Sequence, residues 1–391
     1  MKAEGVAQKR VLPAIEGVMQ GACPERRRLA TFLLGLSKLY SVGMRLRRRM
    51  YQGPWGASRR LACRVVSVGN ITLGGTGKTP MTLFVAQLIH EAGYRTAVVS
   101  RGYKGSAERR GGIVSDGRRL RMGPGQAGDE PFLMARQLLP SGVPVLVGRN
   151  RVRSGNRAIE QFQSEVIVLD DGFQHLRLER DLDLVLLDAA NPFGNGHLLP
   201  RGTLREPVEA LARADACLLT RCPPSAAAGE AVASWQSAIA AMAQRRVRPV
   251  FPAVHRPFVA EHLPTGRRGA SDALQAGIDF RTPAYAFSGI ARNHDFRASL
   301  REMGFPLKGW TDFADHHAYS EEDLRSIAQR ARRRGAQLLV TTEKDRVKIA
   351  PDWIRDMSLL VIGVRIDLGA YNGVFERLVC DRLGLRKKPR S

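Results

Sequence analysis

The chain has 391 residues, which is enough for two domains with sizeable cores. Its formal net charge of +24 predicts attraction to something anionic, such as nucleic acid, an anionic membrane surface or a phosphorylated substrate. The five cysteines are scattered without a CxxC pair, so neither a disulfide framework nor a zinc site is predicted, and a reducing cytosol is expected. No apolar run approaches the roughly 18 residues of a membrane-spanning helix.

The first 60 residues contain one predicted element. Residues 1–25 carry no motif and are interpreted as an extension. Within residues 26–60, a basic amphipathic helix is predicted, because apolar residues follow helical spacing between arginine clusters; the face consists of Leu29, Leu33, Leu36, Tyr40, Gly43 and Leu46, widened by Phe32 and Leu39. Such a helix either lies on an anionic membrane or packs on the protein's own core with a solvated basic rim, and the sequence leaves both open.

The stretch from Arg64 to Pro80 has the order of strand, glycine-rich turn and helix that is typical of a phosphate-binding loop. Lys78 is expected to reach the terminal phosphates of a nucleotide, and the Thr79 hydroxyl is expected to face Mg²⁺. Thr72 stands where the common pattern has glycine. The predicted ATP-binding residues are Thr72, Leu73, Gly74, Gly75, Thr76, Gly77, Lys78 and Thr79.

Two polar motifs follow the next predicted strand, residues 95–100. Arg101 and Tyr103 leave this strand between glycines, either at the ligand-binding edge of an α/β sheet or as a plain basic turn. Residues 105–127 are rich in Gly and Arg and are interpreted as a flexible excursion. Asp129 and Glu130 then open an apolar helix, where adjacent carboxylates cap the helix, coordinate Mg²⁺ or take a proton from a hydroxyl.

A second strong motif follows the apolar strand at residues 165–169. Asp170 and Asp171 end this strand, an arrangement that holds Mg²⁺ directly or through water, and His175 follows closely. Further strands at residues 182–187 and 216–220 continue the rhythm of a parallel sheet. The Pro- and Gly-punctuated loop at residues 192–207 between them is expected to shape a substrate pocket.

The composition shifts near residue 246, and a second α/β unit is predicted from the strands at 249–254, 283–289, 337–342 and 359–366. Within it, His316 or His317 with a nearby aspartate suits an acid/base relay better than a metal site. The segment TTEKD, residues 341–345, resembles the Lys-Asp motif that reads nucleobases in other phosphate-loop enzymes. The predicted division is therefore an extension (1–25), a membrane-associating helix (26–60), a P-loop kinase domain (61–245) and a smaller α/β domain (246–391).

Taken together, GNITLGGTGKTP, SRGYKG, GDEP, LDDGFQH, LPRGTLREP, FSGIARNHDF, DHHAYS and TTEKD occur in an order that resembles the tetraacyldisaccharide 4'-kinases, the lipid A kinases of Gram-negative bacteria. The resemblance runs from about Leu29 to Leu378, and the family shares the departure at Thr72. It implies a P-loop NTPase-type parallel sheet flanked by helices, a smaller C-terminal α/β domain and an N-terminal amphipathic helix on the membrane surface.

The resemblance also implies a reaction. ATP with Mg²⁺ would phosphorylate the 4'-hydroxyl of tetraacyldisaccharide 1-phosphate, at the cytoplasmic face of the inner membrane, without an obligate protein partner. The implied catalytic residues are Asp129 as base, His316 and Lys78; the implied metal residues are Thr79, Asp170, Asp171 and Glu130; and the implied substrate-binding residues are Arg101, Tyr103 and His175.

Two other classes of protein compete with this interpretation. A nucleic-acid-associated P-loop ATPase would explain the charge, but it predicts basic residues interleaved with exposed aromatics, and aromatic residues make up only 6% of the chain. A nucleotide-dependent switch or chaperone would need no acceptor chemistry, whereas the Asp129 and Glu130 pair favours an acceptor hydroxyl. No nucleic acid partner is therefore expected.

Overall fold

The computed structural model describes residues 17, 19, 27–52, 58–223, 229–243, 248–264, 279–353 and 357–386. Nearly all of the predicted extension, residues 1–25, lies outside the described residues. The chain forms two compact units, of which unit 1 comprises Met1–Ser100, Asn150–Val254 and Asp367–Ser391, and unit 2 comprises Arg101–Arg149 and His255–Ile366. The units interleave because the chain leaves unit 1 twice and returns twice. The sequence predicts consecutive domains instead, and that division by function stays a prediction.

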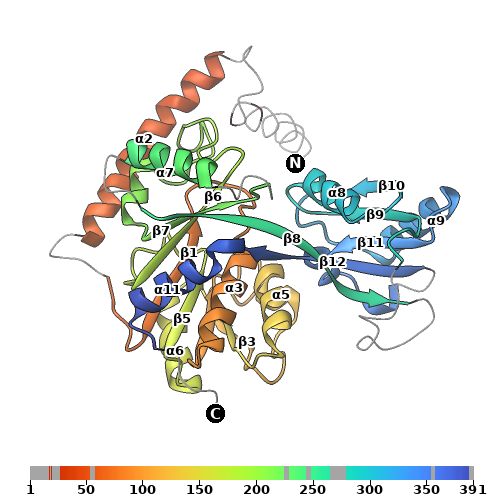
Figure 1. Ribbon diagram of the computed structural model, residues 1–391, viewed down its shortest axis with the longest axis horizontal. Helices are drawn as coiled ribbons and strands as arrows, with labels where there is room; N and C mark the ends of the chain where they lie inside the picture. The colour runs from red at the N-terminus through yellow and green to blue at the C-terminus, as the bar shows by residue number, and fades with distance from the viewer. Residues whose placement is uncertain are drawn as a thin grey trace, which may run out of the picture. The chain divides into compact units, whose positions relative to one another are not determined.

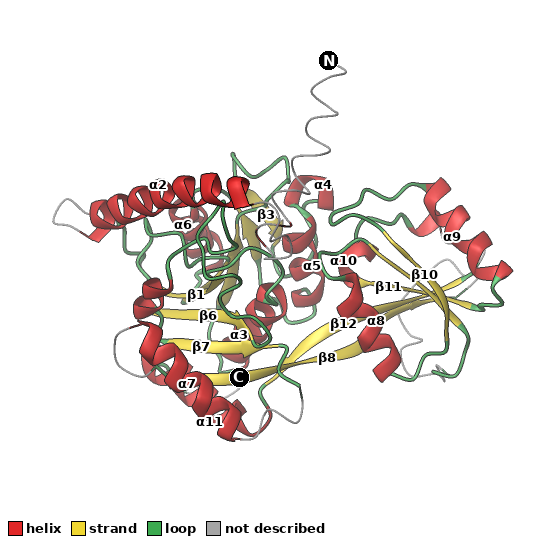
Figure 2. Cartoon of the chain, turned by 90° about the horizontal axis from the view of Figure 1, so that it is seen from above, coloured by secondary structure: helices red, strands yellow, loops and turns green. Residues whose placement is uncertain are grey.

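Unit 1 is built on a parallel sheet with β1 at its centre. The strands are β1 (Arg64–Asn70), β2 (Thr96–Ser100), β5 (Val166–Asp170), β6 (Leu182–Asp188), β7 (Ala216–Thr220) and the first part of β8 (Val250–Leu263). β1 pairs with β5 and β6, β2 pairs outside β5, and β7 pairs outside β6; Figure 2 shows β1, β6 and β7 side by side. These strands are buried on both faces, which is why they appear in the sequence as continuous apolar runs.

Helices cover both faces of this sheet. The helices of unit 1 are α2 (Arg27–Gln52), α3 (Lys78–Glu91), α6 (Arg151–Phe162), η1 (Val208–Arg213), α7 (Gly229–Ala243), η4 (Gly369–Tyr371) and α11 (Asn372–Leu383). α3 packs on β1, β2 and β5. Rings of Phe84 in α3 and Phe375 in α11 lie 6.0 Å apart, and Phe375 also contacts Phe251 of β8 at 5.2 Å, so α3 and α11 cover the same face (Figure 1).

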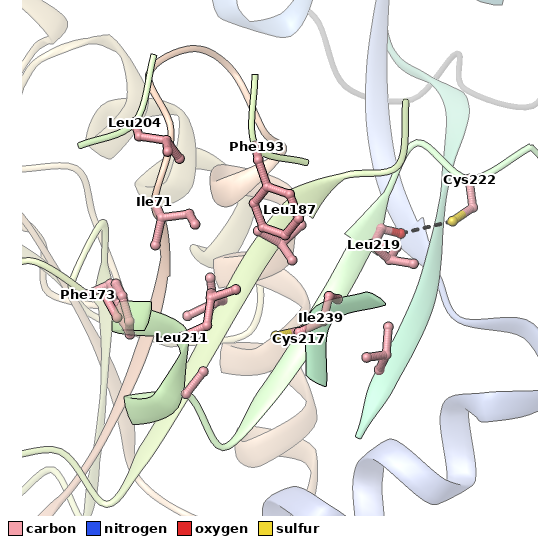
Figure 3. Packing of buried hydrophobic residues seen from close by; sticks show 14 of the residues in the cluster. Ile71, Phe173, Leu187, Phe193, Leu204, Leu211, Cys217, Leu219, Cys222 and Ile239 are labelled. Atoms are coloured by element: carbon pink, nitrogen blue, oxygen red, sulfur yellow. Dashed lines mark hydrogen bonds between the residues drawn. The ribbon is translucent and has the colours of Figure 1, made fainter. Parts of the chain in front are cut away.

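The other face carries a cluster of buried apolar side chains, shown in Figure 3. Leu187 of β6, Leu211 of η1 and Ile239 of α7 belong to this cluster, together with Phe173, which follows β5. Phe173 is fully buried, and a Cβ at Gly69 would lie 2.6 Å from its Cβ. Only glycine therefore allows the turn after β5 to lie this close to the end of β1.

Helix α2 is present where an amphipathic helix is predicted, but its apolar residues are arranged differently. Leu33 is only 3% exposed, and next to it Ser37 donates a hydrogen bond to the Leu198 carbonyl at 2.8 Å, so this side of α2 docks on unit 1. The exposed side carries a second apolar row, made of Phe32, Leu36, Leu39, Val42, Leu46 and Met50. The single face predicted from Leu29 to Leu46 is therefore wrong, because it merges buried Leu33 with exposed Leu36 and Leu46.

No helix in the described part of the chain is long and apolar enough to cross a membrane. Helix α2, the outermost helix of unit 1 in Figure 1, is long but interrupted by charged residues throughout.

Unit 2 contains four neighbouring parallel strands of the sheet, in the order β10-β9-β11-β12. Its strands are β9 (Ala284–Ser288), β10 (Leu307–Asp312), β11 (Leu338–Thr342) and β12 (Ser358–Asp367), and its helices are α4 (Pro124–Ala127), α5 (Asp129–Leu138), α8 (Asn293–Glu302), α9 (Glu321–Arg333), α10 (Glu343–Arg346) and η3 (Pro351–Trp353). Separate apolar clusters, one with α9 and one with α8, cover the two faces of the sheet.

A smaller part of unit 2 lies around α5. β3 (Gly112–Ser115) pairs antiparallel with β4 (Val145–Val147), and α5 packs on both strands. The excursion predicted at residues 105–127 is therefore not without structure, since it contains β3 and α4. Neither β3 nor β10 has an apolar run long enough to be recognised in the sequence.

Candidate active site

The predicted phosphate-binding loop joins β1 to α3 in unit 1. Thr72 and Thr76 are buried, Leu73 is exposed, and Gly74 and Gly77 have φ values of 104° and 82°, which other residues rarely adopt. Lys78 and Thr79 form the first turn of α3, with Gly77 at the N-cap. Backbone N–H groups at this helix start have no intrahelical acceptor, so the loop has the form of an anion-binding site.

Asn70, the last residue of β1, holds the loop in shape. Its side-chain amide donates to the Thr72 carbonyl at 2.8 Å and to the Thr76 hydroxyl at 2.9 Å, while its Oδ1 accepts a hydrogen bond from Lys78 Nζ at 3.4 Å. Asn70 is fully buried. Removing this amide would leave the loop without its internal brace. Sequence reasoning did not single out Asn70, although it stands inside the quoted motif.

The two predicted metal-binding aspartates at the end of β5 have different partners. Asp170 is buried and accepts hydrogen bonds from Ser100 at 2.8 Å and from Thr82 at 3.4 Å. Asp171 has a φ of 50° and turns towards Lys78, whose Nζ lies 3.8 Å from its Oδ1. Burial alone would raise the pKa of Asp171, but Lys78 and Arg205 lower it below the usual value, so the carboxylate is ionised.

Arg205 is a residue of this site that sequence reasoning did not assign. It lies in the Pro- and Gly-rich loop after β6 and makes hydrogen bonds to both Asp171 carboxylate oxygens, at 2.9 and 3.1 Å. The loop is fixed because the Arg205 N–H donates to the Ile71 carbonyl and the Leu73 N–H donates to the Thr203 carbonyl, both at 2.7 Å. The Pro and Gly pattern predicted that this loop shapes a ligand site, but it did not indicate which residue points inward.

Arg221 adds a third cation next to the loop. It follows β7 with a φ of 59°, pairs with Asp188 at the end of β6 at 2.7 Å, and donates a hydrogen bond to the Gly75 carbonyl. The carboxyl ends of β1, β5, β6 and β7 therefore all contribute to one edge, as expected for a parallel α/β sheet.

His175 lies on the turn that follows Asp171 and is largely buried. Its Nε2 has no hydrogen-bond partner among the residues that the structure describes. Burial, and after it the charges of Arg151 and Arg180, lower the pKa of His175 to about 4. The imidazole is therefore neutral at physiological pH.

In unit 2, the two predicted substrate-binding residues lie beside the start of α5. A Cβ at Gly128 would lie 2.7 Å from the Tyr103 carbonyl oxygen, a Cβ at Gly105 would be at least as close to residues 126–128, and a Cβ at Gly102 would lie 3.1 Å from the Ala127 carbonyl oxygen. Tyr103 is 58% exposed, and Arg101 pairs with Glu108 at 2.6 Å. The glycines thus hold Tyr103 next to Gly128, the residue before Asp129.

The predicted acid/base pair forms within unit 2. Nδ1 of His316 lies 3.1 Å from Oδ2 of Asp129, and both side chains are mostly buried. Glu130, the next residue, has its carboxylate 3.1 Å from Lys344 Nζ. The choice between the two adjacent histidines is decided by geometry, since His317 pairs with Asp323 at 3.2 Å and stacks on Phe313.

The candidate residues therefore fall into two groups. The ATP-binding residues, Asp170, Asp171 and His175 lie in unit 1, whereas Arg101, Tyr103, Asp129, Glu130 and His316 lie in unit 2. Among the described residues, no three His, Cys, Asp or Glu side chains are grouped closely enough to hold a metal ion by themselves.

The chain is similar to a well-defined family of enzymes. A family model described as tetraacyldisaccharide-1-P 4'-kinase matches residues 29–383. The chain is 42% identical over 333 residues to the tetraacyldisaccharide 4'-kinase of Syntrophus aciditrophicus (85% of this chain, 87% of that protein) and 41% identical over 339 residues to that of Desulfatibacillum aliphaticivorans (86% and 88%). A crystal structure of LpxK from Aquifex aeolicus in complex with ATP matches with a TM-score of 0.67 and 29% identity, covering 91% of this chain and 99% of that one. The chain therefore belongs to the tetraacyldisaccharide-1-P 4'-kinase family.

Proposed function

We propose that this protein is a kinase that transfers the γ-phosphate of ATP to the 4'-hydroxyl of tetraacyldisaccharide 1-phosphate, a step of lipid A biosynthesis. The observation that carries the proposal is the family match over residues 29–383, in a chain whose β1–α3 connection has the form of a phosphate-binding loop. Phosphoryl transfer depends mainly on positioning and on charge neutralisation, and the two groups of candidate residues supply both.

ATP would bind to the loop from Thr72 to Thr79. The backbone N–H groups at the start of α3 suit the phosphates, and Lys78, which lies 3.8 Å from Asp171, would contact the terminal phosphates. Asn70 supports this role because it braces the loop from inside. The LpxK of Aquifex aeolicus, crystallised in complex with ATP, is the relative that supports ATP as the nucleotide.

The same edge of the sheet suits Mg²⁺. The ion is commonly held by one or two carboxylates together with phosphate oxygens and water, so two aspartates and the Thr79 hydroxyl are a sufficient protein contribution. Mg²⁺ bound with ATP would neutralise the negative charge that develops on the phosphates during transfer. Ser100 and Thr82 fix the orientation of Asp170, and the lowered pKa of Asp171 keeps that carboxylate charged. Glu130, whose carboxylate lies 3.1 Å from Lys344 Nζ, is also proposed as a metal ligand.

We assign the proton transfer to unit 2. Asp129 would accept the proton of the sugar hydroxyl, and His316, 3.1 Å away, would orient its carboxylate. Arg101 and Tyr103 would contact the lipid substrate, which fits the exposed ring of Tyr103 and its place beside Gly128. His175 would contact the lipid substrate through its buried, neutral imidazole.

The lipid substrate also gives α2 a role. A molecule with four acyl chains leaves a bilayer at a large cost, so the enzyme must work at the membrane surface. The exposed row from Phe32 to Met50 would enter the headgroup boundary, and the exposed arginines of α2 would contact anionic lipid. We therefore propose peripheral association with the cytoplasmic face of the inner membrane.

The test is transfer of labelled γ-phosphate from ATP to tetraacyldisaccharide 1-phosphate in mixed micelles, with Lys78→Ala and a DNA-stimulated ATPase assay beside it. Mg²⁺-dependent labelling of the lipid that is lost in the Lys78 variant supports the proposal. ATP hydrolysis that DNA stimulates, without a lipid product, would instead assign the chain to the nucleic-acid-associated ATPases.

A further inference from the structure

The TTEKD segment is not built to read a nucleobase. It spans the end of β11 and α10, and Thr342 caps α10 by accepting a hydrogen bond from the Asp345 N–H at 3.1 Å. The Asp345 side chain is fully buried and accepts hydrogen bonds from Lys348 Nζ and from the Gly289 N–H, both at 3.0 Å. A carboxylate in this position has no surface to offer a base, so the segment must serve another purpose.

One contact of Asp345 leads to the candidate acid/base pair. The Gly289 N–H donates to Asp345, and the Gly289 carbonyl accepts a hydrogen bond from the His316 N–H at 3.1 Å. His316 has a φ of 65°, a left-handed conformation that a residue other than glycine adopts only when its surroundings enforce it. Asp345 and Gly289 therefore fix the backbone of the turn that presents His316.

Lys344 contacts the residues that flank this pair in the sequence, Glu130 and Asp315. Its Nζ lies 3.1 Å from Glu130 Oε1 and 3.7 Å from Asp315 Oδ1. The other oxygen of Asp315 lies 3.8 Å from Nε2 of His316, whose Nδ1 lies 3.1 Å from Asp129. Since Asp129 and Glu130 are consecutive in the backbone, these four side-chain contacts join five residues in a closed ring, in which Lys344 links Glu130 to Asp315.

The surroundings favour this role over a contact with solvent. The Lys344 side chain is only 22% exposed, and its Nζ contacts the carboxylates of both Glu130 and Asp315. The neighbouring cations have other partners, since Arg136 and Arg346 both pair with Glu261. Gln137 of α5 also donates to Glu343 at 2.7 Å, which fixes α10 against α5 independently of Lys344.

We propose that Lys344 is a positioning residue for the Asp129 and His316 pair, acting by holding Glu130 and Asp315 in place. The inference rests on the proposed kinase function and adds to it a role for Lys344, to which the resemblance assigns none. Lys344 has no step in the reaction itself. Its loss should therefore change the orientation of the base and leave nucleotide binding intact.

The experiment compares Lys344→Met and Lys344→Gln, which remove the charge, with Lys344→Arg, which keeps it, in the micelle assay. The neutral variants should lower kcat about 10- to 100-fold, the cost of a misplaced catalytic group, with KM for ATP changed less than about twofold. Lys344→Arg should recover most of the lost kcat. Lys308→Met, at an exposed position of the same unit, is the matched control and should leave both constants unchanged.

Each outcome decides between the alternatives. Wild-type kcat in a folded neutral variant overturns the inference, and so does a raised KM for ATP with kcat unchanged, which would make Lys344 a nucleotide contact. If Lys344→Met does not fold, Lys344→Gln decides; if neither folds, Lys344 is a structural residue and the inference is wrong. A wild-type protein without lipid phosphorylation refutes the proposed function itself, and that result is separate because it needs no variant.

Discussion

Because the imidazole of His175 is buried, we expect the stability of the folded protein to depend on pH. The pKa of His175 is lowered from 6.5 to about 4, first by burial and then by neighbouring arginines. Because the folded-state pKa lies below the unfolded value, the stability that depends on the neutral imidazole is complete above about pH 6.5 and is lost as the pH falls towards about 4. Linkage gives a loss of about 2 kcal/mol between about pH 7.5 and 5.0, and about 3 kcal/mol in full.

The perturbation is His175→Gln, which replaces the imidazole by an amide that does not titrate. As the pH is lowered from about 7.5 to 5.0, the free energy of unfolding of unit 1 should decrease in both proteins. We expect this decrease to be about 2 kcal/mol larger in the wild type than in the variant. Hydrogen exchange of peptides from β5 and β6, followed across urea concentrations, measures the stability of unit 1 separately. His294→Gln is the control, because the side chain of His294 is 74% exposed.

Two results would refute this reasoning. One is an equal pH-dependent loss in the wild type and in His175→Gln. The other is a ¹³C-histidine NMR signal, assigned by its absence from the variant, that titrates near pH 6.5. Either would mean that the imidazole is hydrated in the folded protein, and the assignment of a neutral His175 to ligand binding would fall with it.

The remaining predictions concern the proposed base and the proposed membrane contact of α2. Asp129→Asn should lower kcat by about 10² to 10⁴, because the amide cannot accept the proton, while ATP binding measured by calorimetry stays the same; unchanged turnover would remove Asp129 as the base. Replacing Phe32, Leu39 and Leu46 together by serine should weaken binding to anionic vesicles about 100-fold with little loss of thermal stability, since all three are at least 60% exposed. Leu33→Ser is the contrast, because Leu33 is only 3% exposed and its loss should destabilise the fold. Vesicle binding by the triple variant equal to that of the wild type would show that the membrane-binding surface lies elsewhere.

The sheet of unit 1 and the phosphate loop could be predicted because their signals are local. Strands buried on both faces leave continuous apolar runs, and the loop between β1 and α3 has its glycines and Lys78 within a few residues. Asp170 and Asp171 were found in the same way, since they follow directly on such a run. Parallel strands end at one edge of a sheet, so the proximity of these motifs follows from the fold class alone.

Arg205 and Asn70 escaped prediction because their roles depend on pairing between distant segments. Arg205 is 34 residues from Asp171 and meets it only because the loop after β6 returns to residues 71–73. The chain has many arginines in comparable loops, and nothing in their sequence separates the inward one from the solvated ones. Asn70 likewise reads as the last residue of a strand until its amide is seen inside the loop.

Helix α2 shows a related limit of periodicity. Spacing of three and four residues identified the helix, yet apolar residues occur on two of its sides, and the pattern gives no information on which side docks. The packing of Leu33 and the hydrogen bond of Ser37 decide it, because they bury one side against unit 1. What remains exposed is then the row from Phe32 to Met50, which is the surface that we propose for membrane binding.

The TTEKD segment carries this reasoning to the site itself. As a string it resembles a base-reading motif, because both place a Lys and an Asp after a buried strand. Its chemistry is decided by the neighbours that the fold provides, which here bury Asp345 beneath Gly289 and direct Lys344 to two carboxylates. The charge of Lys344 is paired with the carboxylates of Glu130 and Asp315. Lys344 is therefore expected to act on the geometry of the groups that surround it. The effect of Lys344 on turnover is therefore expected to pass through Asp129 and His316, which is why a split between kcat and KM, rather than loss of activity alone, is the result that tests it.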